Sequence, residues 1–97
     1  MTIKSEMNGA VLTISPEGRL DTVTAPALDA FLEAVPAEID ALRFDLTALD
    51  YISSAGLRLL LKAYKKMNGA MTLANVNEVN NEIFEITGFT EIFNFET

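Results

Sequence analysis

The sequence contains no cysteine, no histidine and no tryptophan among its 97 residues. Without cysteine the chain has no disulfide, no thiolate nucleophile and no zinc ribbon, and without histidine it has no imidazole base or imidazole metal ligand. These absences exclude hydrolases of the Ser-His-Asp and Cys-His kinds. The common glycine-rich phosphate loops, Gly-x-x-x-x-Gly-Lys and Gly-x-Gly-x-x-Gly, are also missing. We therefore predict no catalytic residue, no cofactor and no metal site.

Basic residues are scarce as well, and apolar runs are short. The sequence has seven Lys and Arg residues against fourteen Asp and Glu residues, a net charge of −7. Such a molecule repels the phosphates of nucleic acids and the anionic surfaces of membranes. Apolar runs such as Leu59–Leu61 are far too short to cross a bilayer, and the first residues lack a basic and then apolar signal region. We expect a cytoplasmic protein that binds no nucleic acid and does not insert into membranes.

What the chain does contain is typical of one compact domain. Apolar residues make up 49% of the chain and charged residues 22%, with only three prolines and five glycines. A chain of this length folds around a single core and buries roughly two thirds of its unfolded surface. We predict one domain over residues 1–97.

Hydrophobic periodicity predicts strands that alternate with helices. Residues 2–7 and 10–15 alternate on either side of Asn8-Gly9, a pair typical of type I′ hairpin turns. Further strands are expected at residues 41–46, 71–74 and 92–95, and helices at residues 24–35, 54–67 and 77–88. This order favours parallel βαβ units joined to the hairpin. We predict an α/β fold of two layers, with a mixed β-sheet and helices packed mainly on one face.

Capping residues and apolar stripes support the predicted helices. Thr24 and Asn77 are suited to cap helix N-termini. Asn68-Gly69 and Gly88 are suited to end helices in the left-handed conformation. In the third helix an apolar stripe, which we expect to be buried, consists of Val79, Ile83 and Ile86.

The predicted helix at residues 54–67 has two chemically different faces. At about 100° per residue, its apolar stripe contains Leu57, Leu60, Leu61, Tyr64 and Met67. The opposite face carries four of the seven basic residues, namely Arg58, Lys62, Lys65 and Lys66. Leu59 falls between the two faces beside Ala55 and Ala63, where we expect it to be exposed. No acid occurs from Tyr51 to Asn77, so this basic face is either an ordinary solvated face or a docking surface for an acidic patch.

Two serines stand where a strand ends and this helix begins. Ser53 and Ser54 lie at a helix N-terminus, where backbone N–H groups lack intrahelical partners and the helix dipole is positive. The simplest interpretation is that one of them is an N-cap, because serine is a preferred capping residue. The residues by themselves favour that structural role.

Longer segments of the sequence resemble a known family. They are Gly18-Arg19-Leu20-Asp21, Phe44-Asp45-Leu46 and Leu49-Asp50-Tyr51-Ile52-Ser53-Ser54-Ala55-Gly56-Leu57. Together they resemble the STAS domain of bacterial anti-sigma-factor antagonists, and the likeness covers essentially the whole chain in element order. Its most specific part is Ser-Ser-Ala-Gly-Leu. The resemblance implies a STAS-like fold of the predicted two-layer kind.

The resemblance also implies a partner-switching function without catalysis. Family members bind an anti-sigma factor that is also a serine kinase of the GHKL ATPase type, and so free a sigma factor. The kinase inactivates them by phosphorylating a serine at the start of the second helix, and a serine phosphatase reactivates them. A protein that exchanges partners in this way is expected to be a monomer.

The family motif, Asp-Ser-Ser/Thr-Gly-Leu, implies specific site residues. With its Gly-Leu aligned on Gly56 and Leu57, the phosphorylated residue is Ser54, while Ser53 replaces the usual acid and is the second candidate. Asp21 either binds the Ser54 loop or caps the first helix. The implied partner-binding surface contains Asp21, Thr22, Ser53, Ser54, Ala55, Gly56, Leu57, Arg58, Leu59 and Lys62.

Two other functions stay open. A domain of this kind could be a binding subunit of another complex, such as the ATPase of a membrane transporter, and use the same surface without phosphorylation. A third hypothesis is an enzyme or a small-molecule sensor that uses the carboxylates of Asp21, Asp45 and Asp50. The spacing of these carboxylates is not diagnostic of a site.

Overall fold

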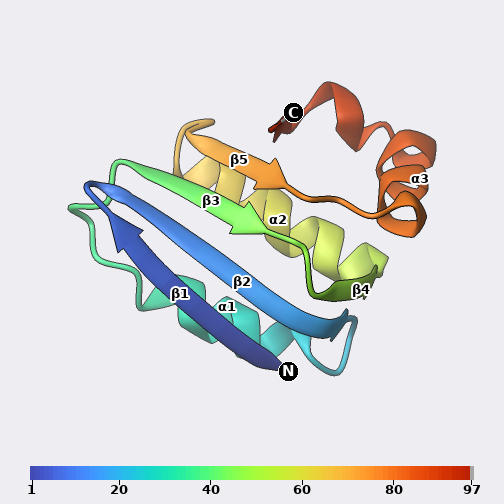
Figure 1. Cartoon of the computed structure of the whole chain (residues 1–97), viewed down its shortest axis with the longest axis horizontal. Coiled ribbons are helices and arrows are strands. Elements are labelled where there is room, and N and C mark those ends of the chain that lie inside the picture. Colours follow the sequence, from blue (N-terminus) through green and yellow to red (C-terminus); the bar gives the residue numbers. More distant parts are fainter. Residues whose placement is uncertain (97) are drawn as a thin grey trace.

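The computed structural model describes residues 1–96, so the predicted domain of residues 1–97 ends one residue beyond the described part. The described residues form a mixed β-sheet with helices against it (Figure 1). The elements are, in chain order, β1 (Thr2–Asn8), β2 (Val11–Leu20), α1 (Ala25–Glu33), β3 (Ala41–Asp45), β4 (Leu49–Ile52), α2 (Ser54–Lys66), β5 (Met71–Ala74), α3 (Glu78–Thr87), the 3₁₀ helix η1 (Phe89–Glu91) and β6 (Asn94–Phe95).

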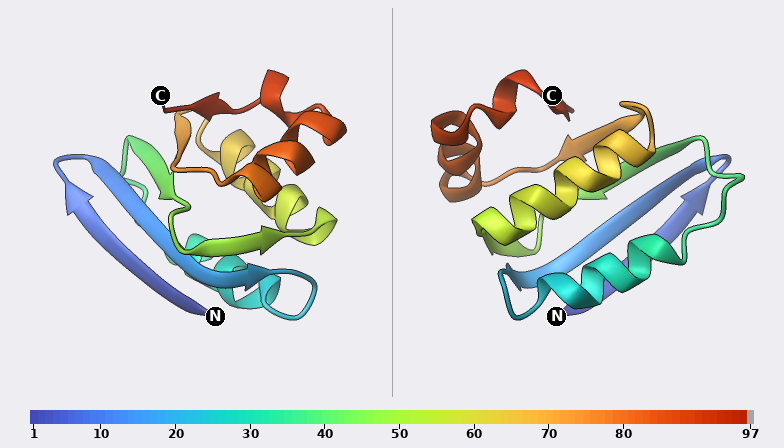
Figure 2. Two further views of the ribbon diagram at one scale, coloured as in Figure 1. Left: turned by 45° about the vertical axis from the view of Figure 1, so that its right-hand side comes forward. Right: turned by 180° about the vertical axis from the view of Figure 1, so that it is seen from behind.

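The sheet is built around β2, its longest strand. The strand order is β1-β2-β3-β5-β6, and β4 lies off this path beside the far end of β2. Within residues 1–96, β1 and β2 pair antiparallel and the other neighbouring strands pair parallel. Figure 2 shows α1 and α2 running across one face of the sheet, while the opposite face is left open. The predicted two-layer α/β fold, with a mixed sheet and helices mainly on one face, is confirmed.

Strand β2 is longer than predicted because it changes partners halfway. Residues 11–14 pair with β3, and residues 18–20 pair with β4. Pro16 lies between these two stretches, where β2 needs no backbone donor on that side. Gly18 follows with a φ of +96°, and a β-bulge between Gly18 and Arg19 bends the strand toward β4. The expectation that the strand ends at Ser15 was therefore wrong.

Two local predictions at the sheet need correction. Strand β4 was not predicted, because its four residues do not alternate: Leu49 and Ile52 are buried and Asp50 is exposed.

The hairpin loop consists of Gly9 and Ala10, since Asn8 already pairs with Val11. Gly9 has a φ of +63° and Ala10 is not among the described residues with positive φ, which is the pattern of a type II′ turn rather than type I′.

The caps predicted for the end of α2 and for both ends of α3 are confirmed, whereas Thr24 stands at the N-cap position of α1 but its side chain makes no capping hydrogen bond. Asn68 and Gly69, with φ of 52° and 86°, end α2, and Gly88, with φ of 80°, ends α3. At the start of α3, the Asn77 side chain accepts a hydrogen bond from the Asn80 amide. Helix α1 is shorter than predicted and ends at Glu33.

Two residues of the apolar stripe predicted for α3 are exposed, and the third, Ile83, is half-buried against the core. The exposed fractions are 54% for Val79 and 77% for Ile86. The helix instead buries Asn80 and Phe84. Phe84 meets Phe93 and Phe95 edge to face, with ring centres 6.0 and 5.5 Å apart, and so packs α3 against the end of the chain. The last strand, predicted at residues 92–95, is reduced to β6, because Ile92 is the C-cap residue of η1 and the Phe93 amide donates back to the Phe89 carbonyl.

Asn80 fixes β4 to α3 through two buried hydrogen bonds. Its side-chain oxygen accepts from the Ile52 amide at 2.9 Å, and its side-chain nitrogen donates to the Leu49 carbonyl at 3.1 Å. The Asn80 side chain is fully buried. It therefore replaces, along one edge of β4, the backbone partners that a neighbouring strand would supply.

We expect Asn80→Ala to lower the free energy of unfolding by about 1–3 kcal/mol, because it leaves the buried Ile52 amide without a partner, while the Leu49 carbonyl still accepts from the Asn77 side chain. The measurement is urea unfolding followed by circular dichroism. The matched control is Asn81→Ala, which removes only an exposed hydrogen bond to Glu85 and should change stability by less than about 0.5 kcal/mol. Equal losses in the two variants would contradict the role given to Asn80.

Candidate functional site

The two serines lie where the carboxyl ends of β2 and β4 meet the start of α2. The Ser53 amide donates to the Leu20 carbonyl at 2.9 Å, which joins the end of β4 to the end of β2. Ser53 is the N-cap residue, with extended backbone, and its carbonyl accepts from the Leu57 amide at 2.9 Å. Ser54 is therefore the first residue of the helix, as the sequence predicted.

The two hydroxyl groups have opposite surroundings. Ser54 is exposed to solvent. The hydroxyl oxygen of Ser53 is buried and has no hydrogen-bond partner among residues 1–96, and it does not make the capping bond that a serine at this position usually makes. Another protein can reach the exposed Ser54 directly, whereas the hydroxyl oxygen of Ser53 is covered in this conformation.

Asp21 organises its own loop at the end of β2. Its carboxylate oxygen Oδ1 accepts from the Val23 and Thr24 amides at 3.0 and 3.1 Å. In return the Asp21 amide donates to the Thr24 hydroxyl oxygen at 2.9 Å, and that hydroxyl donates to the Arg19 carbonyl at 2.6 Å. Of the two roles considered for Asp21, the structure supports capping of the turn into α1.

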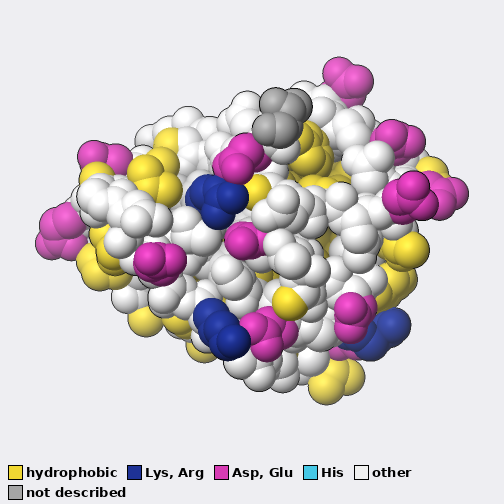
Figure 3. All heavy atoms as spheres, in the orientation of Figure 1, with side chains coloured by type: hydrophobic (Ala, Val, Ile, Leu, Met, Phe, Trp, Pro, Cys, Tyr) yellow, Lys and Arg dark blue, Asp and Glu magenta, His cyan; other side chains and the backbone are white. Residues whose placement is uncertain are grey.

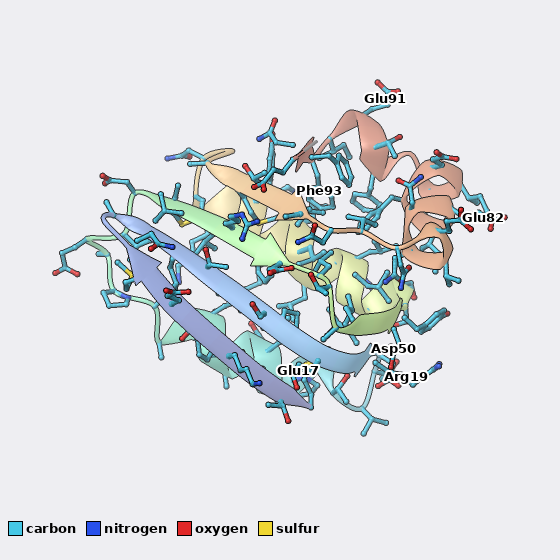
Figure 4. The ribbon with its side chains drawn as sticks, viewed as in Figure 1. Glu17, Arg19, Asp50, Glu82, Glu91 and Phe93 are labelled. Atoms are coloured by element: carbon cyan, nitrogen blue, oxygen red, sulfur yellow. The ribbon has the colours of Figure 1, made fainter. Side chains whose placement is uncertain are left out.

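Arg19 and Tyr51 cover the outer side of this junction. They are register partners on β2 and β4, and the guanidinium carbon lies 4.5 Å from the centre of the tyrosine ring. The Arg19 Nε is also 3.9 Å from an Asp21 carboxylate oxygen. In Figure 4, Arg19 and Asp50 lie together at this end of the sheet, and Glu82 and Glu91 lie away from it on the α3 and η1 side.

A groove separates the N-terminal halves of α1 and α2 beside Ser54. It has a volume of about 390 Å³ and is lined by Thr22, Ala25, Pro26, Asp29, Ala55, Arg58, Leu59 and Lys62. The groove thus gathers five of the ten residues implied by the family motif. Ala55 and Arg58 belong to the first turns of α2, so the groove begins directly behind the exposed serine.

Leu59 is buried, contrary to the expectation that it would be exposed. Its exposed fraction is 6%. The reason is that α2 packs against α1 as well as against the sheet, so its buried face includes Gly56, Leu59, Leu60 and Ala63. The partner-binding role implied for Leu59 would therefore act through the floor of the groove.

The basic face of α2 is partly neutralised within the chain. The Lys62 ammonium lies 3.0 Å from a carboxylate oxygen of Asp29 and 3.0 Å from one of Glu33, both on α1. The Lys62 ammonium donates hydrogen bonds to these two carboxylates, and they raise the pKa of Lys62, the bond to Glu33 most strongly. Arg58 and Lys65 are exposed and make no ion pair within residues 1–96. Fewer basic residues on this helix face therefore lack an acidic partner than the sequence alone indicates.

Gly56 is required where α2 lies closest to the sheet. A Cβ atom added there would meet Ile52 Cγ1 and Leu20 Cγ, each at 2.7 Å. Gly56 and Leu57 are both buried, so these two residues of the motif position the helix rather than present side chains to a partner.

Of the carboxylates considered for an enzyme or a sensor, those of Asp21 and Asp45 hold separate turns, and Asp50 is an exposed residue of β4. Asp45 Oδ1 accepts hydrogen bonds from the Thr47 amide, the Thr47 hydroxyl and the Asn75 side chain. These bonds lower the pKa of Asp45, and the bond from Asn75 has the largest effect. Residues 1–96 contain no group of three or more acidic side chains that could hold a metal ion. None of the helices described is long and apolar enough to cross a membrane.

Comparison with known proteins gives consistent matches. The family model of the STAS domain matches residues 2–97. The chain is 38% identical over 81 residues to BtrV of Bordetella bronchiseptica, a proposed anti-sigma factor antagonist, with 79% of this chain and 70% of that protein covered. It is 33% identical over 79 residues to the anti-sigma-B factor antagonist of Listeria monocytogenes, covering 77% and 69%. A crystal structure of an anti-sigma factor antagonist from Mycobacterium paratuberculosis superposes with a TM-score of 0.87 at 30% identity, covering 97% and 83%.

We expect Gly56→Ala to destabilise the protein by about 1–3 kcal/mol, because the added methyl group overlaps two buried branched side chains. The gain in helix propensity, at most about 1 kcal/mol, does not offset that clash. Thermal and urea unfolding measure the change. The control is Ala55→Ser at the neighbouring, partly exposed position, for which we expect a change within about 0.5 kcal/mol. A Gly56→Ala variant as stable as the parent would show that the close packing is not required.

We expect the stability of the protein to fall in acid partly through Asp21. Hydrogen bonds from the Thr24 and Val23 amides hold the pKa of Asp21 below its ordinary value of 3.8. Its ionised form therefore contributes stability that is fully present above that value and is lost as the pH falls through the lower pKa of the folded state. Unfolding free energies measured from neutral pH downward should decline less steeply for Asp21→Asn than for the parent. Parallel pH profiles would contradict this role.

Proposed function

The chain belongs to the STAS domain family, and from this premise we propose that it is a cytoplasmic anti-sigma factor antagonist controlled by phosphorylation of Ser54. In this proposal the partner is an anti-sigma factor that is also a serine kinase of the GHKL type. Binding of the chain to that partner frees a sigma factor. Phosphorylation of Ser54 by the same partner ends the interaction, and a serine phosphatase restores it.

The exposed Ser54 hydroxyl is the observation that carries the proposal. It stands at the first position of α2, while the hydroxyl of the neighbouring Ser53 is buried. A kinase needs the acceptor hydroxyl to be accessible, which supports Ser54 over the second candidate. The relatives named as anti-sigma factor antagonists supply the class of partner.

A phosphate at Ser54 has a clear physical effect on binding. It adds about −1.5 to −2 charges and three acceptor oxygens at the edge of the groove between α1 and α2. In the free chain the α2 amides and Arg58, one turn along, stabilise this charge. A partner surface that fits a neutral hydroxyl would instead bury a dianion. A loss of only about 3 kcal/mol would weaken binding about 100-fold, which is enough for a switch.

The groove supplies the matching contact surface. Thr22, Ala55 and Pro26 offer small side chains that permit close approach, and Asp29 and Lys62 form a polar wall. In this proposal the chain is the substrate of the kinase, and no acid, base or nucleophile role is assigned to any of its residues.

We expect the cognate kinase with ATP to add one phosphate to the parent chain and to Ser53→Ala, but none to Ser54→Ala. Intact mass spectrometry and phosphopeptide mapping measure this. Phosphate on Ser53 in the Ser54→Ala variant would transfer the switch to the second candidate. Absence of phosphate in all three proteins would contradict the switch while leaving the family assignment untouched.

Binding by the same variants separates this function from its alternative. Immobilised parent chain should retain the kinase from a lysate of the source organism, and Ser54→Asp should retain it at least about tenfold less well, because even one negative charge is costly at a desolvated contact. Equal recovery of a transporter ATPase by both proteins would support a binding subunit that works without phosphorylation.

A further inference from the structure

We propose that the outer edge of β1 pairs with the same edge of a second copy of this chain, in an antiparallel arrangement whose twofold axis passes through Ser5. The proposal rests on the free edge of the sheet, on the order of charges along β1 and on an apolar hollow beneath it. It is independent of the function proposed for Ser54. It also departs from the monomer expected from the sequence.

Strand β1 ends the sheet with an unoccupied hydrogen-bonding edge. It pairs with β2 from Thr2–Glu17 through Asn8–Val11, and residues 1–96 provide no strand on its other side. All of its residues except the half-buried Ile3 are exposed. Figure 1 shows β1 as the outermost strand of the sheet on that side. A row of unpaired backbone donors and acceptors of this kind is a template for another strand.

The register with β2 determines which side chains share a face of β1. Ile3 and Met7 lie opposite the buried Pro16 and Leu12, so the odd residues point toward the helix layer. Lys4 and Glu6 therefore point to the open face. Lys4 is 3.2 Å from Glu17, whereas Glu6 has no ion pair among the described residues.

The charges of β1 are complementary in one symmetric register. When two β1 strands pair about Ser5, Lys4 of each copy lies opposite Glu6 of the other, and Ile3 lies opposite Met7 on the helix side. Pairing about Lys4 or about Glu6 would instead place like charges opposite each other, which is destabilising. The exposed charges thus oppose these two registers and favour the one centred on Ser5.

An apolar hollow lies beneath the same edge, and a second copy that pairs with β1 would bury part of its apolar surface. It has a volume of about 610 Å³, and its lining includes Ser5, Met7, Leu12, Phe31, Val35 and Ile39. Met7 is 51% exposed at its rim. Figure 3 shows hydrophobic side chains gathered along the left and lower left of the molecule, on the side that β1 borders. In the proposed register Ile3 of the second copy comes to lie beside Met7 over this hollow.

The net charge of the chain limits the strength of the dimer. Two copies of −7 repel each other, and the edge of one strand is smaller than a standard interface. We therefore expect a weak dimer that forms at micromolar or higher concentration. Its interface uses none of the residues that surround Ser54, so both states of the proposed switch are compatible with it.

Cross-linking through a single introduced cysteine tests the register, because the chain has no cysteine of its own. In the proposed pair the two Ser5 Cα atoms lie about 4.5–5.5 Å apart, within the range that a disulfide spans. Ser5→Cys treated with diamide should give a covalent dimer. The control is Thr2→Cys on the same strand, because its two copies would be roughly 20 Å apart and should cross-link far more slowly.

Exchange of the two charges tests the same contact without a covalent bond. In sedimentation equilibrium, Glu6→Lys should weaken the dimer roughly tenfold or more, because two like-charge contacts replace two attractive ones and the Lys4–Glu17 pair stays intact. Adding Lys4→Glu to Glu6→Lys should restore association. Thermal unfolding at low concentration checks that each variant is folded.

Two outcomes would overturn the proposal. One is a parent chain that stays monomeric up to millimolar concentration, and the other is equal cross-linking of Ser5→Cys and Thr2→Cys. In either case the edge of β1 does not pair with a second copy of this chain, and it pairs with a strand of another protein or with no strand. A chain that dimerises as described but is never phosphorylated would uphold this inference and contradict the proposed function.

Discussion

The change of partner along β2 is the constraint on which the rest of the structure depends. The first part of β2 pairs with β3, and after the bulge at Gly18 its last residues pair with β4. The Gly18 amide donates to the Ala48 carbonyl at 2.9 Å, so the bend and the β3–β4 connection are held by the same bond. Because Leu20 then accepts from the Ser53 amide, the loop that contains Asp21 and the start of α2 are neighbours. A straight β2 would leave these two segments apart.

Two buried contacts support this end of the molecule from the inside. Asn80 binds both Leu49 and Ile52 through their backbone groups, so β4 keeps its place although it has only four residues. Gly56 lets the first turn of α2 approach Leu20 and Ile52 without a clash. The buried contacts therefore fix the backbone of α2 that carries the exposed Ser54 and Arg58. They also give the groove between α1 and α2 a defined shape.

Local signals in the sequence predicted well those features that depend on local structure. The start of α2 at Ser54 and the caps at Asn77 and Gly88 follow from the chemistry of a few adjacent residues. Features that depend on distant partners were missed. Leu59 is buried because α1 lies against α2, and Val79 is exposed because α3 turns Asn80 and Phe84 inward. Strand β4 was missed because its four residues do not alternate, and its outer edge is bonded by a side chain of α3 rather than by a strand. No property of one segment alone reveals such pairings.

The unsatisfied hydroxyl of Ser53 divides the Ser-Ser-Ala-Gly-Leu motif into two kinds of position. Gly56 and Leu57 are dictated by packing, so any sequence that keeps this fold must keep something close to them. The Ser53 hydroxyl makes no bond within residues 1–96, so folding gives no reason to prefer a serine there over another small residue. The serine at position 53 is therefore required neither by packing nor by hydrogen bonding within residues 1–96. A motif that is continuous in the sequence thus consists, in this molecule, of two residues dictated by packing, Gly56 and Leu57, beside a position 53 whose side chain the fold does not specify.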